Sequence, residues 1–168
     1  EETTDDEGLS GAQRMAAEGA MDSVDYVIAQ HVDPKKPVGT IGINAGPSSG
    51  GVENWRATIT GKGGHGAHPH AAVDPVLVAG HIITAVQSIV SRNVSPIDTA
   101  VISLCAMQAG NPGAMSVIPS HAKLVGTVRT FRPATQDLIE RRLGELVPSL
   151  AAALGARATV KYERIYPA

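Results

Sequence analysis

Three histidines lie in one glycine-rich stretch, Gly61-Lys62-Gly63-Gly64-His65-Gly66-Ala67-His68-Pro69-His70. Histidine transfers protons and binds metal ions near neutral pH. Glycine is used where the backbone needs a positive φ angle or a close approach to another group. A loop of this composition is therefore a candidate for a place where chemistry is presented. Composition alone leaves a second interpretation equally open, in which the segment is a glycine-rich turn with solvated histidines.

The segments on either side of this loop are expected to be a strand and a helix. Residues 52–60 alternate between a polar face and a face that carries Trp55, Ala57 and Ile59, which is strand periodicity. Asp74-Pro75 is a strong helix start, with Asp as N-cap and Pro at the first helical position. Apolar residues at helical spacing carry that helix to about Asn93.

The remainder of the chain repeats the same kinds of element. Strands are expected at 99–107, 121–131 and 158–165. A second helix begins at Pro133, with a kink at Pro148 and Gly155 as its C-cap residue. From Val52 onward, the order is strand, helix, strand, strand, helix, strand. This order predicts an α+β, ferredoxin-like βαββαβ domain, in which an antiparallel sheet carries both helices on one face.

A Gly-, Pro- and Ser-rich linker at 46–51 separates this domain from the beginning of the chain. We place the boundary so that the domains are 1–46 and 47–168. In the first part, apolar runs at 24–30 and 38–44 are read as strands, the earlier of which delivers His31 at its end.

The composition limits the classes of function. A net charge of −2 over 168 residues argues against nucleic acid as a partner. No apolar run reaches the length of a membrane span, so no membrane contact is expected. The single Cys105 excludes an internal disulfide framework and favours a reducing, cytoplasmic location. An exposed sheet edge is a pairing site, so we expect a homodimer through the 47–168 domain, by an edge strand or a helix face.

Several stretches together resemble the di-zinc amidohydrolases, the aminoacylase/carboxypeptidase-type metallopeptidases that include hippurate hydrolase and indole-acetyl-amino-acid hydrolase. The matching pieces occur in order over nearly the whole chain. They are Glu1-Glu2, Gln30-His31-Val32, Gly63-Gly64-His65-Gly66-Ala67, Asp74-Pro75-Val76, Ile89-Val90-Ser91-Arg92, Val117-Ile118-Pro119 and Gly126-Thr127-Val128-Arg129-Thr130.

The resemblance implies a role for individual residues. Glu1 would be the general base, while Glu2 and His31 would be ligands of two divalent metal ions, which the resemblance implies are zinc. His65 would reach the active site of the partner subunit and donate a hydrogen bond to the oxyanion. Arg129 would bind the carboxylate of the substrate, although an ordinary strand arginine is an equal alternative. A metal site formed by His65, His68 and His70 alone is a minor alternative.

The implied reaction is hydrolysis of the amide bond of small N-acyl amino acids by metal-activated water. The implied organisation is a fragment of the zinc-binding catalytic domain at 1–46, followed by a lid and dimerisation domain at 47–168. Glu2 and His31 do not complete a catalytic zinc site, which needs three protein ligands per metal. We therefore expect an amidohydrolase in the full-length parent. As the alternative, the chain alone is an inactive module for dimerisation and substrate capping.

Overall fold

The computed structural model describes residues 11–167. The chain divides into two compact units, residues 1–42 and 43–168. The first unit contains the short helix α1, Gly11–Ala17, which has no buried residue.

The strands expected at 24–30 and 38–44 are not formed, and the described part of the first unit contains no strand. Their apolar side chains are exposed: Tyr26 is 89% exposed, Ile28 94% and Ile41 85%. A strand is stable only when its backbone groups pair with a neighbour. An apolar, β-branched run therefore predicts a strand only where a partner strand is at hand.

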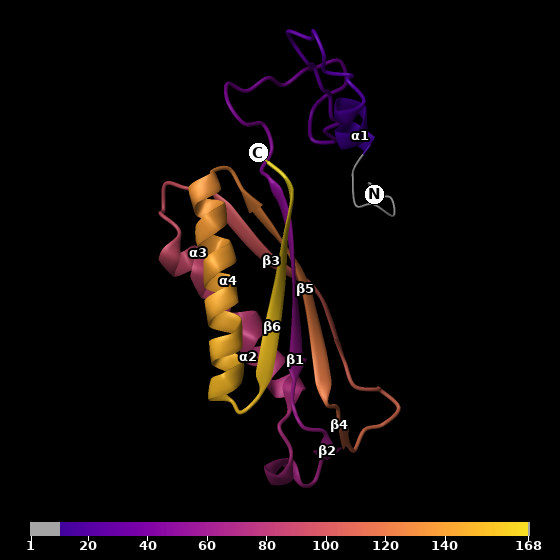
Figure 1. Ribbon diagram of the computed structural model, residues 1–168, viewed down its shortest axis with the longest axis vertical. Helices are drawn as coiled ribbons and strands as arrows, with labels where there is room; N and C mark the ends of the chain where they lie inside the picture. The colour runs from indigo at the N-terminus through magenta and orange to yellow at the C-terminus, as the bar shows by residue number, and fades with distance from the viewer. Residues whose placement is uncertain (1–10, 168) are drawn as a thin grey trace. The chain divides into compact units, whose positions relative to one another are not determined.

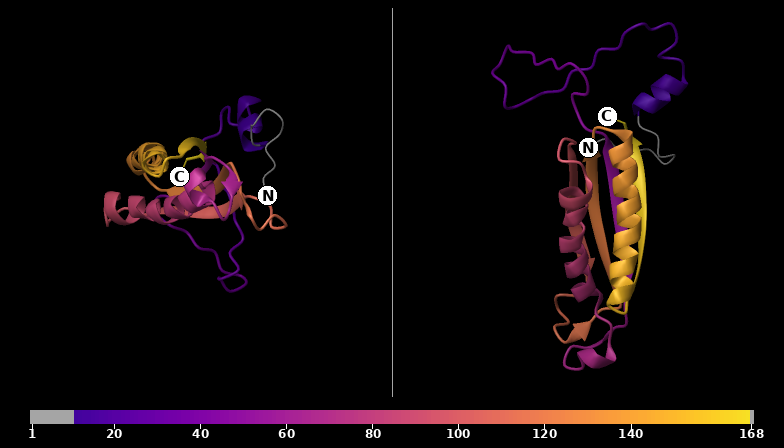
Figure 2. Two further views of the ribbon diagram at one scale, coloured as in Figure 1. Left: turned by 90° about the horizontal axis from the view of Figure 1, so that it is seen from below. Right: turned by 90° about the vertical axis from the view of Figure 1, so that its left-hand side faces the viewer.

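The second unit contains a sheet with helices on one face (Figures 1 and 2). Its elements are β1 (Val52–Thr60), β2 (Gly64–His65), η1 (Pro69–Ala71), α2 (Pro75–Ala85), α3 (Gln87–Asn93), β3 (Ala100–Ala109), β4 (Val117–Ile118), β5 (His121–Thr130), α4 (Pro133–Ala153) and β6 (Arg157–Tyr166). The four long strands lie in the order β3-β5-β1-β6, and every neighbouring pair is antiparallel. This is the ferredoxin-like arrangement that the order of elements predicted.

The core lies between the sheet and the helices. Trp55, Ala57 and Ile59 of β1 are at most 1% exposed, so the alternation in the sequence identified the buried face correctly. They belong to one apolar cluster with residues of the three helices, among them Val78, Ile82, Ile89, Ile139, Leu143 and Val147. Burial of aliphatic side chains is the main stabilising term in a domain with so few aromatic residues.

The helix after the histidine loop starts as predicted and ends differently. The Asp74 side chain accepts hydrogen bonds from the backbone N–H groups of Val76 and Leu77, at 2.8 and 3.4 Å. The expected single helix to Asn93 is instead two helices that meet at Val86. The segment 75–93 has the length and composition of a membrane span. However, one face of this segment is buried in the core, as is typical of helices that pack on a sheet. The buried residues are Val78, Ala79, Ile82 and Ile89.

One polar side chain lies on the buried face of β1. Glu53 is fully buried, and its Oε1 accepts hydrogen bonds from Thr130 Oγ1 at 3.1 Å and from Gln136 Nε2 at 2.5 Å. Its Oε2 and the hydroxyl of Tyr162 on β6 are buried without a hydrogen-bond partner. Burial of this hydroxyl, together with the charge of Glu53, raises the pKa of Tyr162.

Trp55 is accommodated by the absence of a side chain on the neighbouring strand. Gly126 of β5 is its direct partner in the sheet. A Cβ atom at position 126 would lie 2.2 Å from Trp55 Nε1 and 2.3 Å from the carbonyl oxygen of Ser103. Gly126 is thus required for close packing and not for a positive φ angle.

Candidate active-site loop

The loop that carries His65 is held by backbone hydrogen bonds at one end of the sheet. β2 pairs with β4, so that His65 lies opposite Val117. Gly66 N donates to the Ser116 carbonyl at 2.7 Å, and His68 N donates to the His65 carbonyl at 2.8 Å. His65 itself is exposed, as are His68 and His70. The loop therefore has a defined backbone that presents its histidines to solvent.

The glycines of this loop allow other backbone groups to approach closely. A Cβ at Gly61 would lie 2.2 Å from the Val73 carbonyl oxygen, and one at Gly63 would lie 3.0 Å from that of Ile118. None of the glycines at 61, 63, 64 and 66 has a positive φ angle. Glycine is therefore needed at these positions for the close approach of other backbone groups, and not for a positive φ angle.

A backbone hydrogen bond defines the neutral form of the His65 ring. Ala67 N donates to His65 Nδ1 at 3.1 Å. A backbone N–H can only donate, so Nδ1 must be an acceptor and the proton of the neutral ring resides on Nε2. His65 is thereby fixed as a hydrogen-bond donor through its outer nitrogen. This is the form needed to stabilise negative charge on a substrate oxygen.

The three histidines do not form a metal site. The ring centroids of His65 and His68 are 5.4 Å apart, and those of His68 and His70 are 6.1 Å apart. Within residues 11–167, no group of three His, Cys, Asp or Glu side chains could hold a metal ion. The minor alternative of a self-contained metal site in this loop is not supported.

Arg129 lies on β5 between the buried residues Val128 and Thr130, so its side chain is on the sheet face opposite the helices. Its Nη1 donates to the carbonyl oxygen of Val128 at 2.8 Å and to the hydroxyl of Thr127. The side chain is half-buried. A guanidinium carries five N–H donors, so these contacts can orient the group and leave donors for a carboxylate.

His65 and Arg129 are at opposite ends of the sheet. Arg129 is one residue beyond the Glu53–Val128 pair, whereas β2 follows the other end of β1, where Thr60 pairs with His121 (Figure 1). The eight steps along the strand from His121 to Arg129 span roughly 26 Å at the usual rise per residue. His65 lies beyond that span. One copy of this domain cannot place both side chains on the same small substrate.

The metal ligands expected from the sequence are described only in part. Glu1 and Glu2 lie outside the described residues. His31 is exposed, and its Nδ1 lies 2.7 Å from the Val32 carbonyl oxygen. A carbonyl only accepts, so Nδ1 carries the proton and Nε2 keeps the free electron pair that a metal ion needs. The tautomer of His31 suits a metal ligand, but the described residues supply no complete ligand set.

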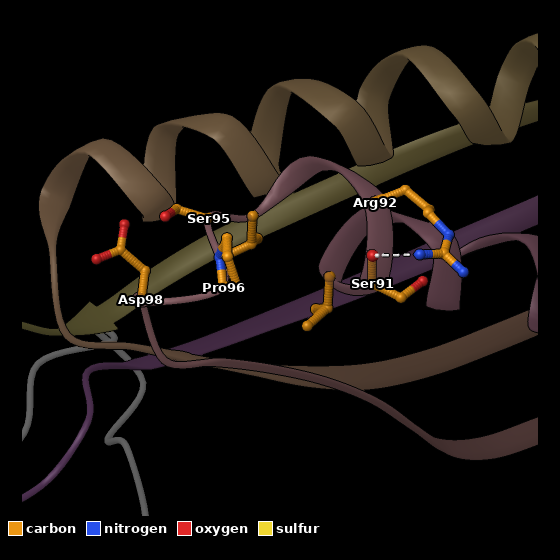
Figure 3. A pocket seen from close by; sticks show the side chains of 7 residues that line it. Ser91, Arg92, Ser95, Pro96 and Asp98 are labelled. Carbon is orange, nitrogen blue, oxygen red and sulfur yellow. Dashed lines mark hydrogen bonds between the residues drawn. The ribbon is translucent and has the colours of Figure 1, made fainter.

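A pocket lies at the end of α3 (Figure 3). In it, Arg92 Nη1 donates to the Ser91 carbonyl at 3.4 Å. Asp98 is paired with Arg132 at 2.7 Å and accepts a hydrogen bond from Thr135. Its charged side chains are thus occupied by neighbouring groups of the protein.

Comparison with known proteins identifies the domain. The family model of the M20 peptidase dimerisation domain matches residues 48–153. The chain belongs to this family. The peptidase dimerisation domain therefore comprises β1 to α4, including the histidine loop and Arg129.

Related proteins of known name extend beyond this chain. It is 37% identical to an N-acetylcysteine deacetylase of Bacillus subtilis over 94% of its own length and 41% of the relative's. It is also 37% identical to an IAA-amino acid hydrolase of Arabidopsis thaliana, over 92% of the chain and 34% of the relative. A crystal structure of a dinuclear metal-binding peptidase of the M20 family from Bacillus subtilis has 30% identity and a TM-score of 0.70, over 93% of the chain and 37% of that structure. The chain thus spans well under half the length of these relatives.

The sequence did not reveal everything that surrounds His65. The short ribbon of β2 and β4 was not expected, because two-residue strands carry too little periodicity to be recognised. Val117 was noted only as part of the family pattern, and the structure places it and Ser116 beside the histidine loop. Their signal is the pairing of two segments about fifty residues apart, which no local pattern encodes.

Proposed function

We propose that this chain is part of a metal-dependent amidohydrolase that cleaves N-acyl amino acids, and that its peptidase dimerisation domain completes the active site of a second subunit. His65 would donate from Nε2 to the oxyanion that forms on the scissile carbonyl of the partner's substrate. Arg129 would bind the carboxylate of the substrate held by its own subunit. The names of the relatives, which are deacetylases and an amino acid hydrolase, support this class of reaction.

The observation that carries the proposal is the separation of His65 and Arg129 along one sheet. In an N-acyl amino acid, the scissile carbonyl and the carboxylate are about one residue apart, roughly 3.8 Å in chain length. The sheet separates the two side chains by far more than this. If both side chains serve one substrate, they must come from two copies of the chain.

The state of His65 is suited to this role. The hydrogen bond from Ala67 N keeps His65 Nδ1 as an acceptor, so the proton of the neutral ring is on Nε2. The ring can therefore donate a hydrogen bond from Nε2 without a change of tautomer. Removal of one oxyanion donor lowers kcat by roughly 10²–10³ in other acyl-transfer enzymes. We expect a loss of this order for His65→Ala in the full-length enzyme.

The metal centre is proposed from the resemblance together with the state of His31. Glu2 and His31 would be among the ligands of two divalent ions, proposed to be zinc, and Glu1 would accept a proton as general base. Bound zinc supplies a water molecule that is deprotonated near neutral pH. The Nδ1–H of His31 donates to the Val32 carbonyl, which would hold the imidazole in its ligand form.

Glu2 and His31 are fewer than the three protein ligands that each catalytic zinc ion needs, and this supports the second role that the sequence left open. We propose that the isolated chain is an inactive dimerisation and capping module. Stoichiometric zinc in the purified chain, or hydrolysis of an N-acyl amino acid by it, would contradict this proposal.

The edges of the sheet indicate how two copies could pair. β6 carries four charged side chains, at 157, 161, 163 and 164, whereas β3 has none along its ten residues. Val101 and Met107 on β3 are 46% and 47% exposed. Charged residues on an edge strand oppose pairing with another chain. We therefore propose that the homodimer forms through the β3 edge.

The experiment is subunit complementation in the full-length parent enzyme. The variants His65→Ala and Glu1→Gln are purified, mixed in equal amounts, dissociated and reassociated. Each homodimer should be nearly inactive. In a heterodimer, the His65→Ala subunit keeps Glu1 and receives an intact His65 from its partner, so one of its two sites is restored.

With random reassociation, half of the dimers are heterodimers, and about a quarter of the wild-type activity should return. The matched control mixes His68→Ala with Glu1→Gln, and here the His68→Ala subunit should be active before mixing. If His65 acts within its own chain, no heterodimer restores a site and the mixture stays inactive. That result would overturn the proposal.

A further inference from the structure

The residue opposite His65 on the β2–β4 ribbon is an exposed valine. Val117 is the direct antiparallel partner of His65, and directly opposed residues project from the same face of a ribbon, with Cβ atoms about 5 Å apart. The Val117 side chain is 62% exposed, and Met115, in the preceding turn, is 96% exposed. Apolar side chains are therefore presented to solvent beside the exposed imidazole.

The position of Val117 relative to His65 limits what it can contact. A hydrogen bond from His65 Nε2 holds the carbonyl oxygen of a substrate at about 2.9 Å. The carbonyl carbon bears the acyl chain on one side and the amino acid on the other. The carboxylate of the amino acid is proposed to bind Arg129 of the other copy, and this directs that half away from the ribbon of His65. The acyl chain remains as the part nearest to Val117.

We propose that Val117, with Met115, forms an apolar contact for the acyl chain of the substrate bound to the partner subunit. This inference rests on the proposed function and deepens it. The two residues would favour acyl groups with an extended hydrocarbon chain over acetyl. They act as specificity determinants in trans: Val117 lies on the ribbon that carries His65, and Met115 lies in the turn before it. Methionine is flexible and adapts to chains of different shape.

The first test compares acyl chain lengths in the full-length dimeric enzyme. kcat/KM is measured for the N-acetyl, N-butanoyl and N-hexanoyl derivatives of one amino acid, with wild type and with Val117→Thr. Threonine keeps the shape of valine and suits a strand, but its hydroxyl opposes contact with hydrocarbon. The preference for hexanoyl over acetyl should fall by roughly tenfold.

The matched control is Val125→Thr. Val125 lies in the interior of β5, is 36% exposed, and takes no part in the histidine loop or in the contacts of Arg129. This variant should keep the wild-type profile of acyl chain lengths. An unchanged ratio of hexanoyl to acetyl in Val117→Thr would overturn the inference.

The second test does not depend on turnover. An N-acyl amino acid analogue with a diazirine at the end of its acyl chain is bound to the full-length enzyme and irradiated, and the labelled peptide is identified by mass spectrometry. The label is expected within residues 113–118 and should be reduced in Val117→Thr. Labelling confined to other segments would contradict the assignment.

The two levels of the proposal fail in different ways. If the wild-type enzyme hydrolyses none of the N-acyl amino acids, the proposed function is wrong. If it hydrolyses them and Val117→Thr leaves the order of acyl preference intact, the proposed function stands and the inference about Val117 is wrong.

Discussion

Replacement of Gly126 by alanine tests the packing of the sheet most directly. A Cβ at this position would lie 2.2 Å from Trp55 Nε1, 2.5 Å from Trp55 Cε2 and 2.3 Å from the Ser103 carbonyl oxygen. Two of these atoms belong to a fully buried ring and the third to the backbone of a neighbouring strand. None is the free end of a flexible side chain, so the sheet itself must shift.

The expected loss follows from the general cost of overpacking. Extra atoms in a well-packed core typically cost 1–3 kcal/mol, and we place Gly126→Ala at the upper end, about 3 kcal/mol. For a domain of this size, each kcal/mol lowers the melting temperature by about 4 °C. The variant should therefore melt about 12 °C below the wild type.

Thermal unfolding is followed by the fluorescence of Trp55, the one tryptophan of the chain. The matched control is Gly144→Ala on α4, where a Cβ would have no atom within 4 Å. Alanine in place of glycine inside a helix should stabilise by about 0.5–1 kcal/mol. A melting temperature of Gly126→Ala within 2 °C of the wild type, with an unchanged emission spectrum, would refute the packing argument.

Two further predictions concern the pH dependence of stability and the start of α2. The raised pKa of Tyr162 means that the folded state holds this proton more tightly than the unfolded state does, so stability is unaffected below pH about 10 and declines above it. Tyr162→Phe removes a buried hydroxyl that has no partner, and should be neutral to stabilising by about 1 kcal/mol at pH 7, with a shallower decline between pH 9 and 11 in urea unfolding. A lower urea midpoint for the variant at pH 7 would contradict this. Asp74→Ala removes the hydrogen bonds to the N–H groups of Val76 and Leu77 and should cost about 1 kcal/mol in the same assay, whereas Asp74→Asn should keep most of the stability. Equal losses in the two variants would show that the cap is not the cause.

Local patterns predicted the elements whose signals are themselves local. β1 was recognised by alternation, α2 by Asp74-Pro75 and the end of α4 by Gly155, which has a φ angle of +79°. The break between α2 and α3 was missed. Near it, Thr84 and Ser88 donate side-chain hydrogen bonds to helix carbonyls, at 2.9 Å to His81 and 2.7 Å to Ala85. Such bonds compete with the helical backbone and help to bend it.

Features that depend on pairing between distant segments could not be predicted from local sequence patterns. The runs at 24–30 and 38–44 have the composition of strands but no partner strand in the described part of their unit. Alternation along β1 puts Glu53 on the same face as Trp55, but its burial with Thr130 and Gln136 depends on β5 and α4. The roles of Glu1, Glu2, His31, His65 and Arg129 remain predictions.

The length of β1 and β5 also has a consequence for how this domain tolerates change. Two residues inserted into each strand, opposite one another near the middle, would preserve the hydrogen bonds that His65 and Arg129 make with their sequence neighbours. They would nevertheless move the two ends apart by about 7 Å. On the proposed function, the length of the sheet sets the distance between two catalytic centres. The number of residues in these strands is therefore under functional constraint, even at positions that touch neither centre.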